Sequence, residues 1–498
     1  MQEDYIKLIF GLKIKQIRTA KDLSLFKLSK MTGLSKSYLN EIEKGKKYPK
    51  TDKIILLAEA FDVSYDELVS LKLDKNLAPV AEILQSNLLQ EIPLELFGIE
   101  ERDLIEIISN APLKVNAFIS TLIEIGNNYN LTRESFFLAS LRSFQEANDN
   151  YFPEIELAAK NFMNQYSTNK EGETITDDLM MEILKEEFNY EIYIEDFKSY
   201  KRPELGKLRS IFIEEKKHLY INSDSDLDQK RFILAKELGY NYLNLKERLN
   251  TYSWVSFENF DQLLNNFYAS YFAGALLLPE DELIQKLTEL FSSEEHDTKN
   301  FLKLFANYTE SPETVYQRMT NLLPKHFNIR DLFFLRLTTK KGSGNFKLTK
   351  ELHLNQQQSP QANETDEHYC RRWVSLNVLK KLEEAEGLEE QHIISSQISI
   401  YPFNNNQKYY VISSGTRDPF NPDYLRSVTI GILYKSAQRK VKFLSDPTIP
   451  VREVAVTCEN CGMENCAERV APPKRFAKDV HSKRIKVIVN EFIKDKSQ

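Results

Sequence analysis

One short window, residues 23–49, constrains the fold of this chain more than any other part; it is LSLFKLSKMTGLSKSYLNEIEKGKKYP. Ser24 is a favourable N-cap for a first short helix, and Ser35 is a favourable N-cap for a second. Gly33 stands between them, where a sharp turn needs a residue that tolerates a positive φ angle. The pattern therefore predicts two short helices joined by a tight turn.

The second predicted helix has one apolar face and one polar face. Leu39 and Ile42 lie about one turn apart and are expected to face the interior. The opposite face carries side chains that can hydrogen-bond base edges and phosphates in a major groove of double-stranded DNA. Gly45 ends this helix, and the lysine-rich loop that follows suits a phosphate backbone. The predicted DNA-contacting residues are Lys36, Ser37, Tyr38, Asn40, Lys44, Lys46 and Lys47.

The uneven distribution of charge supports this interpretation. Residues 1–50 contain 12 Lys or Arg and 5 Asp or Glu, which gives a net charge of +7. The whole chain has 66 Lys or Arg and 73 Asp or Glu, so its net charge is −7 and the remaining residues sum to −14. Because an acidic body repels polyanions, only the N-terminal head is expected to contact nucleic acid.

The window resembles the lambda-repressor-like, or XRE, helix-turn-helix family. The resemblance covers about the first 70 residues and implies a five-helix domain, with further helices at Thr51–Phe61 and Ser64–Leu71. It also implies an ion pair between Arg18 on the first helix and Glu43 on the third. Leu25 is a departure, since the family often has a glutamine there that contacts the DNA backbone. Because such heads read two half-sites as pairs, we expect a homodimer.

Length and composition limit the number of domains that the rest of the chain can form and the class of protein to which it belongs. With 498 residues, of which 42% are hydrophobic, about three domains are expected. No apolar run approaches the roughly 20 residues of a membrane span, and no signal-peptide pattern is present, so we expect a cytoplasmic protein without a membrane partner. The expected divisions are the head (1–73), a helical connector and dimerisation region (74–150), a middle domain (151–285) and a C-terminal sensor domain (286–498).

The middle domain resembles a zinc peptidase in two stretches. Residues 231–242, RFILAKELGYNY, resemble the active-site helix of the ImmA/IrrE-like metallopeptidases, and residues 272–279 resemble a second stretch of that family. In a HExxH helix, two histidines one turn apart bind zinc and the glutamate between them activates water. Here Lys236 and Tyr240 stand at the histidine positions, and Glu237 is retained.

The resemblance also places Asn266 where the family supplies a carboxylate ligand. A lysine ammonium repels zinc and an amide replaces a carboxylate poorly, so the resemblance implies a degenerate scaffold without enzymatic activity. Glu237 is then expected to be a structural hydrogen-bond acceptor. The alternative function is a metal-dependent peptidase that cleaves a partner repressor.

The four cysteines lie in the last third of the chain, as an isolated Cys370 and a C-x2-C-x4-C cluster. In a cytoplasmic protein this cluster is more typical of metal ligation than of disulfides. Four thiolates suit either a structural zinc ion or an iron–sulfur cluster. Three loop thiols without a metal, together with a buried Cys370, remain a further alternative.

Alternating polar and apolar residues predict strands at 331–337, 397–401, 408–413 and 427–434. They indicate an antiparallel sheet flanked by helices, similar to small-molecule-sensing domains such as GAF or PAS domains. Residues 474–494 are predicted to form a helix. The fold class is therefore mainly α with α+β: a five-helix head, a helical connector, a degenerate zincin-like domain and an α+β sensor domain.

Taken in order, these parts resemble the short-chain fatty acyl regulators. The C-terminal match consists of C-x2-C-x4-C-A-x-R followed by Pro-Pro, with Cys-x-x-Trp upstream. The resemblance implies a transcription regulator whose operator binding is controlled by an acyl-coenzyme A and, in some members, a 4Fe–4S cluster. The alternative is a repressor of phage or mobile-element genes with a structural zinc site. The implied metal ligands are Cys370, Cys458, Cys461 and Cys466.

Overall fold

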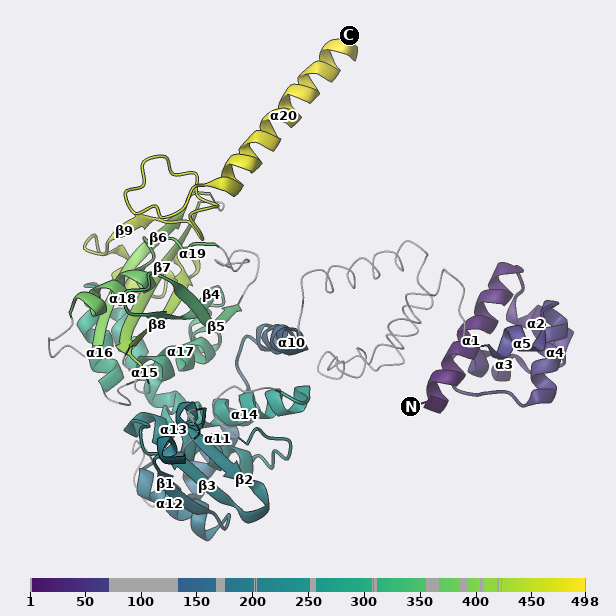
Figure 1. Cartoon of the computed structure of the whole chain (residues 1–498), viewed down its shortest axis with the longest axis horizontal. Coiled ribbons are helices and arrows are strands. Elements are labelled where there is room, and N and C mark those ends of the chain that lie inside the picture. Colours follow the sequence, from purple (N-terminus) through teal and green to yellow (C-terminus); the bar gives the residue numbers. More distant parts are fainter. Residues whose placement is uncertain are drawn as a thin grey trace. The chain divides into compact units, whose positions relative to one another are not determined.

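The computed structural model divides into two compact units, residues 1–140 and 141–498 (Figure 1). Most of the predicted helical connector, residues 74–132, lies outside the described residues. The structure describes residues 2–70, 133–166, 175–200, 202, 204–250, 257–306, 308, 311–354, 367–385, 392–403, 406–418, 421 and 423–497.

The N-terminal unit contains the five predicted helices of the head. The side-chain oxygens of Ser24 and Ser35 accept hydrogen bonds from the backbone N–H groups of Lys27 and Tyr38, and Gly33 has a φ of 69°. The two caps and the turn therefore form as the sequence predicts. The helices are α1 (Gln2–Ala20), α2 (Leu25–Thr32), α3 (Lys36–Glu43), α4 (Thr51–Phe61) and α5 (Tyr65–Val69).

Polar contacts fix α1 against the rest of the head. Arg18 Nε and Nη2 donate to the two carboxylate oxygens of Glu43 at 2.6 and 3.0 Å, which confirms the expected ion pair between α1 and α3. Lys13 is buried, and its Nζ donates to the backbone oxygens of Glu67 and Ser70 at the end of α5. The Arg18–Glu43 pair thus joins α1 to α3, and the Lys13 hydrogen bonds join α1 to the end of α5.

The first half of the second unit is built around a small mixed sheet surrounded by helices, of which α10 begins before the boundary between the units. Its three strands have the order β1-β3-β2, in which β1 is parallel and β2 antiparallel to β3. Gly239 on α13 allows a close helix crossing, since a Cβ there would lie 3.1 Å from the backbone oxygen of Ala269 on α14. The elements are α10 (Arg133–Ala147), α11 (Pro153–Tyr166), α12 (Asp177–Glu186), β1 (Glu191–Glu195), η2 (Phe197–Tyr200), η3 (Leu205–Lys207), β2 (Ser210–Ile213), η4 (Glu214–Lys216), β3 (His218–Asn222), α13 (Leu227–Tyr242) and α14 (Phe260–Leu277).

Three further helices connect this region to the C-terminal sheet. They are α15 (Glu280–Ser292), α16 (Thr298–Ala306) and α17 (Pro312–Phe327). Arg318 on α17 is buried and donates to both carboxylate oxygens of Glu156 on α11, at 2.5 and 2.8 Å. Because both groups are almost entirely removed from water, this pair joins α11 to α17 firmly.

The C-terminal sheet has six strands in the order β5-β4-β8-β7-β6-β9, antiparallel except for β9 beside β6. Helix α18 packs on one face, and α16 and α17 contact strands of the sheet from the other face (Figure 1). The antiparallel sheet and the terminal helix are confirmed, whereas β5 and β9 were not predicted. The elements are β4 (Leu332–Lys340), β5 (Phe346–Leu354), α18 (Val374–Glu384), β6 (His392–Tyr401), β7 (Gln407–Arg417), β8 (Tyr424–Leu433), α19 (Tyr434–Ala437), η6 (Lys442–Ser445), β9 (Val451–Glu453) and α20 (Lys474–Ser497).

Among the helices in the described part of the chain, none combines the length and the apolar character needed to cross a membrane.

Candidate functional site

The predicted DNA-contacting side chains share one face of α3 and the loop after it. Leu39 and Ile42 are buried beneath this face, as expected. Tyr38 is half-buried, and the ammonium of Lys53 lies 4.6 Å from the centre of its ring. The exposed members of the face are Lys36, Ser37, Asn40, Lys44, Lys46 and Lys47.

One lysine of this face also has a partner within the head. Lys47 Nζ lies 2.9 Å from a carboxylate oxygen of Glu41, which raises the pKa of Lys47 through a hydrogen bond and charge attraction. The pair is exposed, so water and salt screen it strongly. Lys47 can therefore exchange Glu41 for a DNA phosphate at little cost.

Phe26, near the start of α2, is part of this surface and was missed by the sequence analysis. Its side chain is 51% exposed, and the ammonium groups of Lys30 and Lys36 lie 4.6 and 4.4 Å from its ring centre. The ring thus holds Lys36 by a cation–π contact. Leu25, the departure from the family pattern, packs partly against the core of the head. A large apolar residue on the polar side of a short helix was the signal available in the sequence.

The three residues that replace the zinc ligands of the metallopeptidases come together in the second unit. Lys236 Nζ donates to Asn266 Oδ1 at 2.6 Å, and the Tyr240 hydroxyl donates to the same oxygen at 3.4 Å. Burial lowers the pKa of Lys236 to about 7. The pseudo-zinc site, defined as these three residues, is therefore closed by internal hydrogen bonds.

Glu237, the retained glutamate, is fully engaged by neighbouring side chains. Arg248 Nη2 donates to its two carboxylate oxygens at 2.7 and 2.6 Å, and the Tyr190 hydroxyl donates at 3.0 Å. The Arg248 guanidinium also lies 3.8 Å from the ring centre of Phe212. Glu237 is thus a structural acceptor in this structure, as expected, and Arg248 occupies the place beside it.

We expect Lys236→Met to increase the stability of the second unit at pH 7. In the folded chain the pKa of Lys236 is about 7, against 10.5 when exposed, so between these values only the unfolded chain binds the proton. Stability therefore rises with pH across this window, and the lysine costs most below about pH 7. Removing it should add on the order of 2 kcal/mol at pH 7 and flatten the pH dependence. Denaturant unfolding at pH 6 to 10 measures this, with the exposed Lys160→Met as control; equal curves for wild type and Lys236→Met would contradict it.

The segment around Cys370 pairs with the segment before the cysteine cluster. Cys370 N–H donates to the backbone oxygen of Val456, and Cys458 N–H donates to that of His368. Burial raises the pKa of the Cys370 thiol to about 11, and the nearby thiols of Cys461 and Cys458 act in the same direction. This pairing brings the isolated cysteine to the cluster.

The loop of the cluster is ordered by Arg469, which donates to the backbone oxygens of Cys458 and Cys461. Cys458 and Cys461 are buried, whereas Cys466 is half-buried. Across the described residues, no group of three or more His, Cys, Asp or Glu side chains is placed to hold a metal ion. The four-cysteine ligand set therefore stays a prediction.

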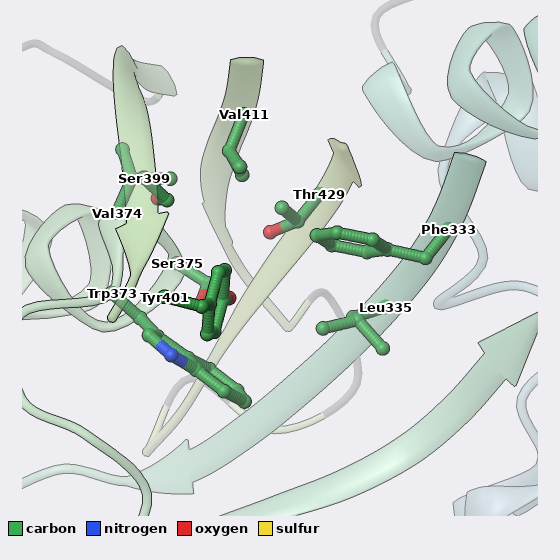
Figure 2. Close-up of a pocket in the computed structure, with 9 residues that line it drawn as sticks. All are labelled: Phe333, Leu335, Trp373, Val374, Ser375, Ser399, Tyr401, Val411 and Thr429. Atoms are coloured by element: carbon green, nitrogen blue, oxygen red, sulfur yellow. The ribbon is translucent and has the colours of Figure 1, made fainter. Parts of the chain in front are cut away.

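A small cavity lies between the start of α18 and the sheet (Figure 2). Its free volume of about 10 Å³ is room for about one water molecule. The backbone N–H of Trp373 donates to the backbone oxygen of Cys370, and its indole N–H donates to that of Ala455, so the cavity wall is joined directly to the cysteine segment. The lining residues are Phe333, Leu335, Trp373, Val374, Ser375, Ser399, Tyr401, Val411 and Thr429.

Comparison with family models agrees with the two resemblances on which the DNA-contacting face and the pseudo-zinc site were predicted. Residues 14–68 match the model of the helix-turn-helix family, and residues 185–320 match that of the IrrE N-terminal-like domain. The second match extends beyond residue 285, where we expected the middle domain to end. The chain therefore carries an XRE-type helix-turn-helix domain followed by an IrrE-like domain.

Two solved structures are similar to parts of the chain. A transcriptional regulator of Mycobacterium tuberculosis is 19% identical, with a TM-score of 0.45, over 66% of this chain and 92% of that one. The restriction-modification controller protein of Aeromonas hydrophila is 35% identical, with a TM-score of 0.12, over 12% of this chain and 94% of that one. A search of curated proteins found no match.

Proposed function

We propose that this protein is a sequence-specific DNA-binding transcription regulator that acts as a homodimer. The observation that carries the proposal is the exposed polar and cationic face of α3, which the Ser35 cap and the Arg18–Glu43 pair hold outward. A helix presented in this way fits the major groove, and its lysines suit phosphates. Two copies of the head would read two half-sites.

The double substitution Lys36→Ala and Asn40→Ala is expected to weaken operator binding by about a hundredfold, because it removes two groups that can contact bases or phosphates. The operator is obtained by selection from random duplexes with the wild-type protein. Affinity is then measured by fluorescence anisotropy at several salt concentrations. Lys216→Ala, an exposed lysine outside the head, should change nothing. Equal affinity of the double variant and the wild type would refute the proposed interface.

We further propose that a small-molecule effector, an acyl-coenzyme A, controls this binding through the C-terminal domain. Half-sites lie about 34 Å apart, so a modest change in the spacing of two heads would break their register on DNA. Support comes from the six-stranded antiparallel-rich sheet, which adjoins the cysteine segment within one domain. Equal operator affinity with and without the effector would eliminate the switch.

The four cysteines are proposed to hold a 4Fe–4S cluster, which would supply redox or oxygen sensitivity. In favour of this, the Cys370 segment pairs with the cluster segment, and Cys458 and Cys461 are buried beside it. Protein purified anaerobically is expected to show broad absorbance near roughly 400 nm, and Cys461→Ser should lose most of it. A colourless protein that contains zinc would favour the structural-zinc alternative.

The IrrE-like domain is proposed to have no peptidase activity. Lys236, Tyr240 and Asn266 bind one another where the related enzymes bind zinc, and Arg248 neutralises Glu237. A glutamate held in this way is a poor general base, because protonating it would break a buried ion pair. The domain would then act as a scaffold between the head and the sensor domain.

A further inference from the structure

Three cations lie together on the face of the C-terminal sheet that α17 contacts. Arg336 on β4 stands directly opposite Lys350 on β5. Arg426 on β8 is paired with Thr338, two residues beyond Arg336 on the same face. Like charges directly opposite each other destabilise a strand pair. The arrangement therefore needs a negative charge to offset it.

One carboxylate, Glu313 at the start of α17, contacts all three cations. Arg336 Nη1 lies 3.0 Å from Oε1, and Lys350 Nζ and Arg426 Nη1 lie 3.9 Å from the carboxylate. Arg426 is also paired with Asp418. The side chains of Arg336 and Lys350 are 21% and 41% exposed, so the group remains open to solvent.

The IrrE-like domain adds two more cations to this region. The charges of Arg209 and Lys350 add to the effect of burial in lowering the pKa of Lys236. Burial raises the pKa of Glu313, but the surrounding cations, Arg209 among them, outweigh burial and lower this pKa to about 2. Asp226, the N-cap of α13, is within electrostatic range of Arg209. The carboxylates described beside these cations are those of Glu313, Asp418 and Asp226. The cationic cluster consists of Arg209, Lys236, Arg336, Lys350 and Arg426.

Buried polar atoms beside the cluster have no hydrogen-bond partner among the residues that the structure describes. They include Arg426 Nε and the hydroxyl of Ser225. Ser225 is the residue before Asp226 and is only 3% exposed. Buried donors are rarely left unsatisfied in folded proteins. These two are therefore candidates to donate to a bound anion.

We propose that the cationic cluster binds the phosphate groups of a phosphorylated small molecule. A phosphate monoester carries close to two negative charges and three acceptor oxygens, so it can contact several of these cations at once, and the fork of an arginine suits phosphate oxygens. A bound phosphate would also relieve the repulsion between Arg336 and Lys350. The proposal rests on effector control of the C-terminal domain and assigns the chemical class of the effector's charged end.

The test measures the binding of inorganic pyrophosphate to the full chain by calorimetry. DNA is left out, so the result does not depend on whether the proposed DNA binding is correct. Wild type should bind pyrophosphate and bind malonate much more weakly. The double variant Arg336→Gln and Lys350→Gln should bind pyrophosphate at least roughly tenfold more weakly. The double variant Lys380→Gln and Lys381→Gln, at two exposed lysines of α18 on the other face of the sheet, removes the same number of charges and should bind normally.

A second variant keeps the proposal open to refutation if the double variant does not fold. Glu313→Gln removes the carboxylate that contacts all three sheet cations. It should lower the thermal midpoint without pyrophosphate and increase the rise in midpoint that pyrophosphate produces. The proposal is wrong if wild type does not bind pyrophosphate, or if binding is the same in wild type, in the double variant and in Glu313→Gln.

Discussion

Replacing Arg248 with alanine is expected to lower the free energy of unfolding of the second unit by about 4 kcal/mol, as typically follows when one partner of a buried pair is removed. The side chains of Arg248 and Glu237 are each only 7% exposed. Without Arg248, the charge of Glu237 would stay buried. Of the side-chain donors that the structure describes for its carboxylate, the Tyr190 hydroxyl would remain. The loss of the contact between the guanidinium and Phe212 adds to the cost. Denaturant unfolding followed by circular dichroism measures the change.

Two further variants separate the buried charge from a general effect of losing an arginine. Arg231→Ala removes an arginine of α13 whose pair with Asp177 is about one-third exposed, and should cost no more than about 1 kcal/mol. The double variant Arg248→Met and Glu237→Gln removes both charges and should recover much of the loss. If Arg248→Ala were no more harmful than Arg231→Ala, the buried charge of Glu237 would not depend on its ion pair with Arg248.

The head could be predicted closely from the sequence because its signals are local. The Ser24 and Ser35 caps and the Gly33 turn each act within a few residues, and all three form as predicted. Phe26 was missed because its role depends on lysines that reach it from two helices. The exposure of the α3 face followed from helical periodicity, since Leu39 and Ile42 fix the side that turns inward.

The second unit was less predictable because its sites join distant segments. Lys236 and Tyr240 are one turn apart on α13, but only the family resemblance placed Asn266 beside them. Arg248 gave no signal, since it lies in an irregular segment after the helix. Strand β9 has three residues, too few to show alternation, and the cationic cluster depends on the strand register, which the sequence does not specify.

Gly11→Ala is expected to destabilise the head by roughly 3 kcal/mol or more and to abolish operator binding at ordinary temperatures. Gly11 lies within α1, where the helix crosses the end of α3. A Cβ atom there would lie 2.2 Å from the backbone oxygen of Ile42 and 3.1 Å from that of Glu43. These neighbours are backbone atoms, so α1 and α3 would have to separate. Separation would strain the Arg18–Glu43 pair and tilt the DNA-contacting face. Thermal unfolding of the head, together with operator affinity, measures the effect.

The matched control for Gly11→Ala is the same substitution at Gly274, which lies within α14. A Cβ atom there would meet nothing within 4 Å. Gly274→Ala should therefore leave operator affinity unchanged and stabilise the second unit by up to about 1 kcal/mol, because alanine favours the helix. The same gain in helix propensity acts at Gly11, so any net loss there reports the clash between α1 and α3. Normal operator affinity and stability of Gly11→Ala would mean that the two helices can separate freely, and that their close crossing does not set the orientation of α3.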